Sequence, residues 1–181
     1  MLLEKEKSCL LLIDVQKKLM PHVQNYDAVL ERCQWLMRLA KELRVPLLVT
    51  EQYPKGLDYT VEPLRDLVSD KEIFAKVHFS CFRTSEFKLH LQSLQKKQLV
   101  LIGIETHVCV LQSALDLRQA GYEVFVVVDA VGSRSDLDYK YGLKRMKQEG
   151  IHLLTSEMVF FEWVEKAGTP EFKALSTSYL K

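Results

Sequence analysis

The chain has 181 residues, of which 48% are hydrophobic and 27% are charged, and its formal net charge at pH 7 is +1. A single hydrophobic core serves chains of up to roughly 250 residues, so we expect one domain over residues 1–181. Acidic and basic residues are interspersed, whereas a nucleic-acid partner requires a concentrated basic face. No apolar run approaches the ~18 residues of a membrane span. Composition therefore favours an enzyme or a binding domain without nucleic-acid or membrane partners.

The four cysteines are too few for a disulfide framework and form no CxxC pair: Cys9, Cys33, Cys81 and Cys109. The first residues, MLLEKEKS, contain two acids and do not form a secretory signal. We therefore expect reduced thiols in a cytoplasmic protein. Cys9 and Cys33 lie on apolar faces, where packing is the ordinary role of a cysteine.

Short apolar runs alternate with segments in which apolar residues recur every three or four positions. The runs predict six strands, at residues 8–14, 45–50, 73–78, 98–103, 124–129 and 151–155. The periodic segments predict helices at residues 26–43, 85–95, 108–120, 137–148 and 157–166. Continuously apolar strands are typical of a parallel sheet that is buried on both faces. The sequence thus predicts a doubly wound α/β fold, a three-layer sandwich with a mostly parallel six-stranded sheet in the order 3-2-1-4-5-6.

Three chemically active residues follow or end predicted strands of this sheet: Asp14 after the first, Lys76 in the third and Cys109 after the fourth. In open α/β sheets, ligands bind beyond the carboxyl ends of the strands, where the strand order reverses. With the expected order, that crevice lies between the first and fourth strands. We therefore expect a carboxylate, an ammonium group and a thiol to meet there.

Cys109 is the most informative of the three because it lies in the first turn of a predicted helix. The helix N-terminus and the Lys76 ammonium should both lower the pKa of the thiol, while Asp14 could accept its proton as a general base. Such a cluster suits attack on an amide or ester carbonyl. Each residue alone also has a simpler interpretation: a buried small side chain, a cap or a solvated charge. Only their combination favours catalysis.

Other residues near this crevice have less specific interpretations. His107 is two positions before Cys109, across a strand-to-helix turn, so the two side chains should point apart. Cys81 could line the pocket or form a disulfide with an oxidised Cys109. Small-molecule sites are mostly apolar with a few polar groups, which indicates four candidate pocket walls: Gln16, Tyr53, Phe79 and Phe82.

The chain resembles isochorismatase-like cysteine hydrolases, a superfamily that includes nicotinamidases and N-carbamoyl amide hydrolases. The matching segments are LLLIDVQKKL, KVHFSCF, GIETHVCVLQSALDLRQAGYEV and VVVDAVGSRS. They occur in the family's order and span almost the whole chain. A further segment, LLVTEQYPKGLDYTVEPL, is similar to the isochorismatase domain-containing subgroup, whose substrate is not well established.

This resemblance implies roles for particular residues. Asp14, Lys76 and Cys109 match the family's Asp-Lys-Cys triad. The match also implies a non-proline cis peptide between Ile104 and Glu105, with the backbone N–H groups of Glu105 and Cys109 forming an oxyanion hole. Family members commonly form dimers or larger assemblies, so we expect a homo-oligomer, with the apolar helix at residues 157–166 either in a subunit contact or in the core.

Departures from the family pattern narrow the expected chemistry. Nicotinamidases hold a divalent metal with an Asp-x-His pair after the second strand, but residues 51–53 read Glu-Gln-Tyr, and no histidine follows before residue 78. We therefore expect neither a metal nor another cofactor, which argues against nicotinamide as the substrate. Leu19 stands where the family has an aromatic residue after its opening DxQ motif. Isochorismatases proper cleave a vinyl ether without a cysteine, so Cys109 favours acyl transfer.

The sequence predicts a hydrolase that cleaves a small-molecule amide-type bond, or a related carbonyl bond, through a Cys109 acyl-enzyme. The alternative is a non-catalytic or redox-sensing protein that uses Cys109 only as a modifiable thiol. A dinucleotide-binding fold is disfavoured, because DVQKK follows the first strand in place of G-x-G-x-x-G.

Overall fold

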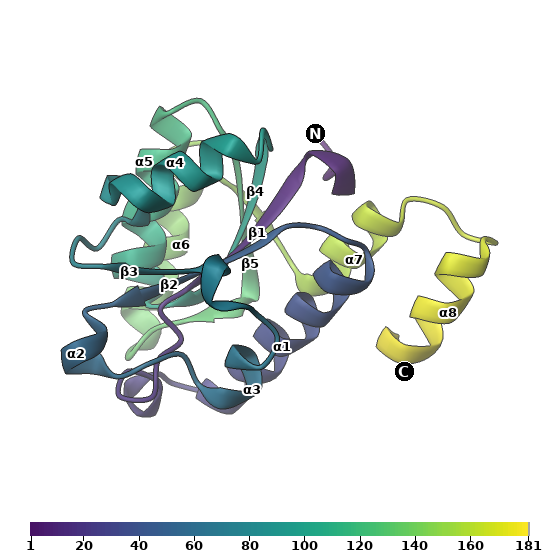
Figure 1. Ribbon diagram of the computed structural model, residues 1–181. Coiled ribbons are helices and arrows are strands. Elements are labelled where there is room, and N and C mark those ends of the chain that lie inside the picture. The colour runs from purple at the N-terminus through teal and green to yellow at the C-terminus, as the bar shows by residue number, and fades with distance from the viewer. Residues whose placement is uncertain (181) are drawn as a thin grey trace.

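Six strands form one sheet in the order β3-β2-β1-β4-β5-β6, and every neighbouring pair is parallel. The computed structural model in Figure 1 describes residues 1–180. The strands are β1 (Ser8–Ile13), β2 (Leu47–Gln52), β3 (Ile73–Lys76), β4 (Gln98–Ile104), β5 (Glu123–Gly132) and β6 (His152–Leu154). The predicted fold class and strand order are thus confirmed.

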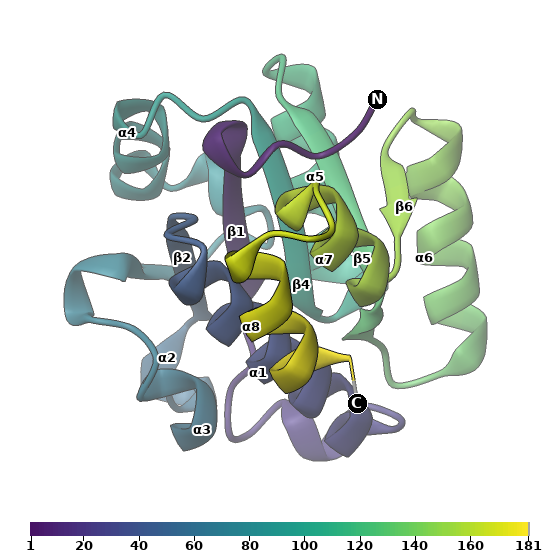
Figure 2. The ribbon, with the colours of Figure 1, turned by 90° about the vertical axis from the view of Figure 1, so that its right-hand side faces the viewer.

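Helices cover both faces of the sheet. They are α1 (Tyr26–Glu42), α2 (Pro54–Leu57), α3 (Glu62–Arg65), α4 (Ser85–Ser93), α5 (Leu111–Gln119), α6 (Asp136–Gln148), α7 (Ser156–Val164) and α8 (Pro170–Tyr179). Figures 1 and 2 show α4, α5 and α6 on one face and α1 and α7 on the other, with α8 outside them. Short helical turns occupy Lys5–Lys7, Met20–His22, Asp70–Glu72, Cys81–Arg83 and Thr106–Val110. Within the described chain, no helix has the length and apolar character of a membrane crossing.

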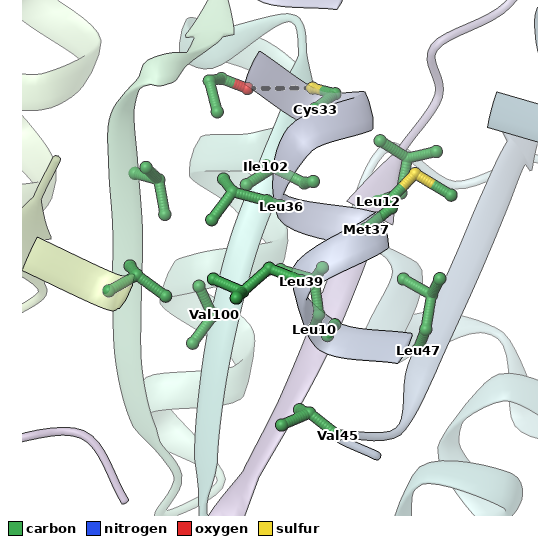
Figure 3. Close-up of a cluster of buried hydrophobic side chains, with 14 of the residues drawn as sticks. Leu10, Leu12, Cys33, Leu36, Met37, Leu39, Val45, Leu47, Val100 and Ile102 are labelled. Atoms are coloured by element: carbon green, nitrogen blue, oxygen red, sulfur yellow. Dashed lines mark hydrogen bonds between the residues drawn. The ribbon is translucent and has the colours of Figure 1, made fainter. Parts of the chain in front are cut away.

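The continuously apolar strands supply two cores, one on each face. Along β1, Leu10 and Leu12 pack into the cluster with α1, whereas Leu11 and Ile13 pack into the cluster with α4 and α5. Figure 3 shows the first cluster, in which α1 residues such as Leu36 lie over β1 and β4. The Cys33 thiol is buried there and donates a hydrogen bond to the Ala130 carbonyl at 3.3 Å, so this cysteine packs as expected.

The main differences from the predicted elements concern strand ends and the C-terminus. Strand β2 begins after Pro46 and continues through Gln52, two residues beyond its predicted end. Helix α8 was not predicted; it packs through Phe172, Leu175 and Tyr179 against the layer of α1 and α7. On α7, one face is buried in the core, but Phe161 is half-exposed.

A close contact between β1 and β4 shapes the crevice at their carboxyl ends. Gly103 has a positive φ of 113°, and a Cβ at this position would collide with the backbone of Ile13. Glycine adopts this conformation without the steric cost that other residues incur. It therefore lets the end of β4 lie directly against the end of β1.

Candidate active site

Asp14 follows β1 directly and is completely buried. Its backbone has a φ of 52°, which turns the chain out of the sheet. The carboxylate accepts a hydrogen bond at Oδ1 from the Thr50 hydroxyl at 2.7 Å and at Oδ2 from the Lys76 ammonium at 2.6 Å. Both of its oxygens are thus fixed by side chains from β2 and β3.

Lys76 ends β3 and reaches across the end of β2 to Asp14, with only 1% of its side chain exposed. Its ammonium also donates to Gln52 Oε1 at 2.6 Å and to the carbonyl oxygens of Phe79 at 3.0 Å and His78 at 3.3 Å. An ammonium has three N–H donors, so these partners account for all of them. The charged form of Lys76 is therefore held by one carboxylate and three neutral oxygens.

Cys109 lies in the turn Thr106–Val110 between β4 and α5, and 7% of it is exposed. Burial and the charge of Asp14 raise the pKa of the thiol, and the Lys76 ammonium opposes them only in part. The expectation of a lowered pKa is therefore wrong, because desolvation of the thiolate outweighs the nearby positive charge. Asp14 and Lys76 are the charged groups that act on the thiol. The structure thus brings the three predicted residues together around a protonated thiol.

The turn that carries Cys109 is wider than an α-helical turn. The Glu105 carbonyl accepts hydrogen bonds from the amides of Val108 at 3.0 Å and Val110 at 3.2 Å. The Ile104–Glu105 peptide is cis in the structure. The sequence predicts Cys109 in the first turn of a regular helix. In the structure, Cys109 lies instead in a π-helical turn, two residues before α5.

The side chain of Glu105 is held by Arg134. The guanidinium donates from Nη2 to Oε1 at 2.6 Å and from Nε to Oε2 at 2.9 Å, and the Arg134 amide donates to Oε2 at 3.2 Å. Burial alone would raise the pKa of Glu105, but the hydrogen bonds and charge of Arg134 outweigh it and lower the pKa. The Arg134–Glu105 pair therefore links the start of the turn Thr106–Val110 to the segment that follows β5.

The contacts of His107 do not include Cys109; they are with Ser133 and with helix α6. Its Nδ1 lies 3.0 Å from the Ser133 hydroxyl, and its backbone packs against Gly142 of α6. A Cβ at Gly142 would lie 3.1 Å from the His107 Cα. His107 is thus part of the contact between the turn and α6.

Cys81 is also buried close to the site. Burial raises the pKa of its thiol to about 12, and its backbone amide donates to the Ser113 hydroxyl at 3.0 Å. Ser113 lies one helical turn after Cys109. All four cysteines are free thiols.

The four predicted pocket walls have different environments. Gln16 is buried and both of its amide hydrogens are used, since Nε2 donates to the carbonyls of Gln52 at 2.9 Å and Asp58 at 2.7 Å. Gln16 therefore links the end of β2 to the loop at Asp58 and is fully buried, which corrects the prediction that it lines the pocket. Tyr53 is 54% exposed and Phe79 is 51% exposed.

The remaining candidate wall, Phe82, packs with Tyr122, their ring centroids 6.1 Å apart. A cavity of about 430 Å³ lies at the outer edge of β3. Its lining includes Tyr53 and Lys76, but Cys109 and Phe79 are not among the lining residues. The predicted walls therefore do not surround a single cavity.

Positions that hold a metal in nicotinamidases have other contacts in this chain. The Glu51 carboxylate accepts hydrogen bonds at Oε1 from the Thr60 amide at 2.8 Å and hydroxyl at 2.7 Å. Tyr53, at the histidine position of that pair, is half-exposed, and Gln52 between the two positions accepts a hydrogen bond from Lys76. The contributions of Thr50 and Gln52 were not predicted from the sequence. Their alternation along β2, on either side of Glu51, is the signal that could have indicated them.

Comparisons with known proteins identify the family of this chain. A family model of the isochorismatase domain matches residues 8–158. Isochorismatase family protein 1B of Dictyostelium discoideum is 39% identical over 175 residues, which cover 94% of this chain and 84% of that protein. Isochorismatase domain-containing protein 2 of Xenopus laevis is 38% identical over 172 residues, covering 94% of this chain and 82% of that protein.

Solved structures share the whole fold. MAR1 ribonuclease from Caenorhabditis elegans has a TM-score of 0.93 and 35% identity, covering 100% of this chain and 93% of that one. The YcaC gene product of Escherichia coli, described as an octameric hydrolase of unknown specificity, has a TM-score of 0.88 and 27% identity, covering 98% and 96%. The chain therefore belongs to the isochorismatase-domain family, which supports a hydrolase function.

Proposed function

We propose that the protein is a cysteine hydrolase that cleaves a small amide-type C–N bond, or a related carbonyl bond, through a Cys109 acyl-enzyme. The observation that supports this most strongly is the buried cluster of Asp14, Lys76 and Cys109. A thiol of raised pKa needs a base before it can attack, and the Asp14 carboxylate, fixed by two hydrogen bonds, is the group that can act as that base.

The first half-reaction forms the acyl-enzyme. Asp14 takes the Cys109 proton while the sulfur bonds to the carbonyl carbon, and the carbonyl π electrons move to its oxygen. The backbone N–H groups of Glu105 and Cys109 stabilise this oxyanion, by about 3 kcal/mol per donor in comparable sites. When the C–N bond breaks, the protonated Asp14 gives its proton to the departing nitrogen.

The second half-reaction returns the enzyme to its resting state. Asp14 removes a proton from a water molecule as that water attacks the thioester carbonyl. The C–S bond breaks, the acid product leaves, and the sulfur recovers a proton from Asp14. Throughout the cycle, the Lys76 ammonium orients Asp14 and stabilises negative charge on the sulfur.

Turnover of small neutral amides, ureas and esters tests this proposal, with the parent protein and Cys109→Ala compared on the same panel. The expected result is hydrolysis by the parent and none by Cys109→Ala, with unchanged circular dichroism. A Cys109→Ala protein as active as the parent on a substrate of the panel would refute the mechanism. If no member reacts and Cys109 is only oxidised reversibly, the redox-sensing alternative holds.

The worm relative is named a ribonuclease, so an RNA substrate belongs in the same assay. RNA cleavage needs exposed positive charge for the phosphates. The Lys76 ammonium is buried and engaged with Asp14 and Gln52, and the net charge of the chain is only +1. We therefore expect no RNA cleavage.

We also propose a homo-oligomer, in line with the octameric relative from Escherichia coli, which sedimentation equilibrium would test.

A further inference from the structure

Gln52 is held at every polar atom of the residue. Its Oε1 accepts from the Lys76 ammonium at 2.6 Å, and its Nε2 donates to the Val77 carbonyl at 2.8 Å. Its backbone amide donates to Gln16 Oε1 at 2.7 Å, and its carbonyl accepts from Gln16 Nε2 at 2.9 Å. These contacts fix the side chain in one orientation, with the oxygen toward the ammonium, because an ammonium requires an acceptor.

The interactions that hold the Lys76 ammonium change in strength during the proposed reaction. In the resting state, Asp14 is its only charged partner among residues 1–180. When Asp14 takes the Cys109 proton, the carboxyl group becomes neutral and the ion pair is lost. The ammonium then depends on its neutral acceptors, of which Gln52 is the closest, at 2.6 Å compared with 3.0 Å for the Phe79 carbonyl.

We propose that Gln52 is a positioning residue, which keeps the Lys76 ammonium beside the Cys109 sulfur while Asp14 carries the proton. This inference rests on the function proposed above. An amide suits the task better than a carboxylate, because it accepts a hydrogen bond without adding negative charge next to a developing thiolate. Gln52 itself touches no reacting atom and acts only through Lys76.

The test follows the rate at which iodoacetamide alkylates Cys109 as a function of pH, with the site of labelling assigned by peptide mass mapping. Asp14 and Lys76 are the charged groups that act on this thiol. Gln52→Met keeps the length but removes the oxygen, and should slow alkylation at pH 7 by about tenfold, as expected for a lost hydrogen bond to a charged group. Gln52→Glu returns an oxygen with a charge, and should move the midpoint of the profile to higher pH.

Gln98 provides a matched control at the opposite end of the sheet. It is also buried, its Oε1 accepts from the Glu4 amide at 2.7 Å, and its Nε2 donates to the Leu2 carbonyl at 3.0 Å. Gln98→Met and Gln98→Glu should therefore weaken the fold without moving the alkylation profile of Cys109.

The outcomes separate this inference from the proposed function. If Asp14→Asn changes the profile but both Gln52 variants match the Gln98 controls, the role of Gln52 is overturned and the catalytic cluster stands. If Asp14→Asn also leaves the profile unchanged, the cluster itself is refuted. If Gln52→Met does not fold, Gln52→Glu decides the question alone: an upward shift supports the role and an unchanged midpoint overturns it.

Discussion

At the scale of single residues, the buried pair of Asp14 and Lys76 has a large effect on stability. Replacing only one partner leaves the other charge buried and unpaired, at a cost of about 3–5 kcal/mol. We therefore expect Lys76→Met to lower the free energy of unfolding by that amount, as measured by urea denaturation. The double variant Asp14→Asn with Lys76→Met should lose clearly less. Equal losses for the single and double variants would show that the pair is not coupled.

The raised pKa of Cys109 gives a second residue-scale prediction. The folded state favours the protonated thiol, so the associated stability is present at pH values below the free-thiol pKa of about 8.5 and is lost as pH rises through the folded pKa. The midpoint of iodoacetamide labelling should accordingly lie above about 8.5 in the parent protein. Asp14→Asn should lower that midpoint, because it removes a negative charge, and yet slow acyl transfer, because it removes the base. A parent midpoint below the free value would contradict this account.

At the scale of elements, the turn Thr106–Val110 depends on its contact with α6. The Cβ of a Gly142→Ala variant would lie 3.1 Å from the His107 Cα, so the turn must move by a few tenths of an ångström. Alanine also favours the helix by about 1 kcal/mol. We expect slower acyl transfer at Cys109 with little loss of melting temperature. Lys140→Ala, at an exposed position on the same helix, should leave the rate unchanged.

Elements with strong apolar patterns were predictable, and those defined by tertiary contacts were not. Strand β1 and helix α1 were predicted to within one residue at each end, because continuous and periodic apolar patterns are unambiguous there. The end of β2 was predicted too early, since Glu51 and Gln52 are polar and their hydrogen-bond partners, among them Thr60 and Lys76, come from distant parts of the chain.

The same reasoning applies to the site. The fold class, in which ligands bind at the carboxyl ends of the strands, was sufficient to predict that Asp14, Lys76 and Cys109 lie close together. The direction of the Cys109 pKa shift was not predictable, because it depends on how completely neighbouring elements exclude water. The link formed by Gln16 also depends on a contact with the loop at Asp58, which no local pattern indicates.

At the scale of the whole molecule, α8 packs on α1 and α7, on the side of the sheet away from Cys109. Tyr179 packs edge-on against Trp35, with ring centroids 5.1 Å apart, and Leu175 is buried. A chain that ends at Lys166 would expose this surface, and each lost apolar side chain should cost about 1.5–3 kcal/mol. We expect a lower urea midpoint but an unchanged rate of Cys109 alkylation in the folded protein. A loss of that reaction without unfolding would show that α8 contributes to the site.

The covalent intermediate is the most direct measurement of the central claim. Exposure of the protein to an activated acyl donor such as p-nitrophenyl acetate, followed by intact-mass spectrometry and peptide mapping, should show one acetyl group on the Cys109 peptide. That adduct should be absent from Cys109→Ala and should form more slowly in Asp14→Asn. Acetylation of the parent at other residues only, or equal labelling of Cys109→Ala, would contradict a thiol nucleophile at this site.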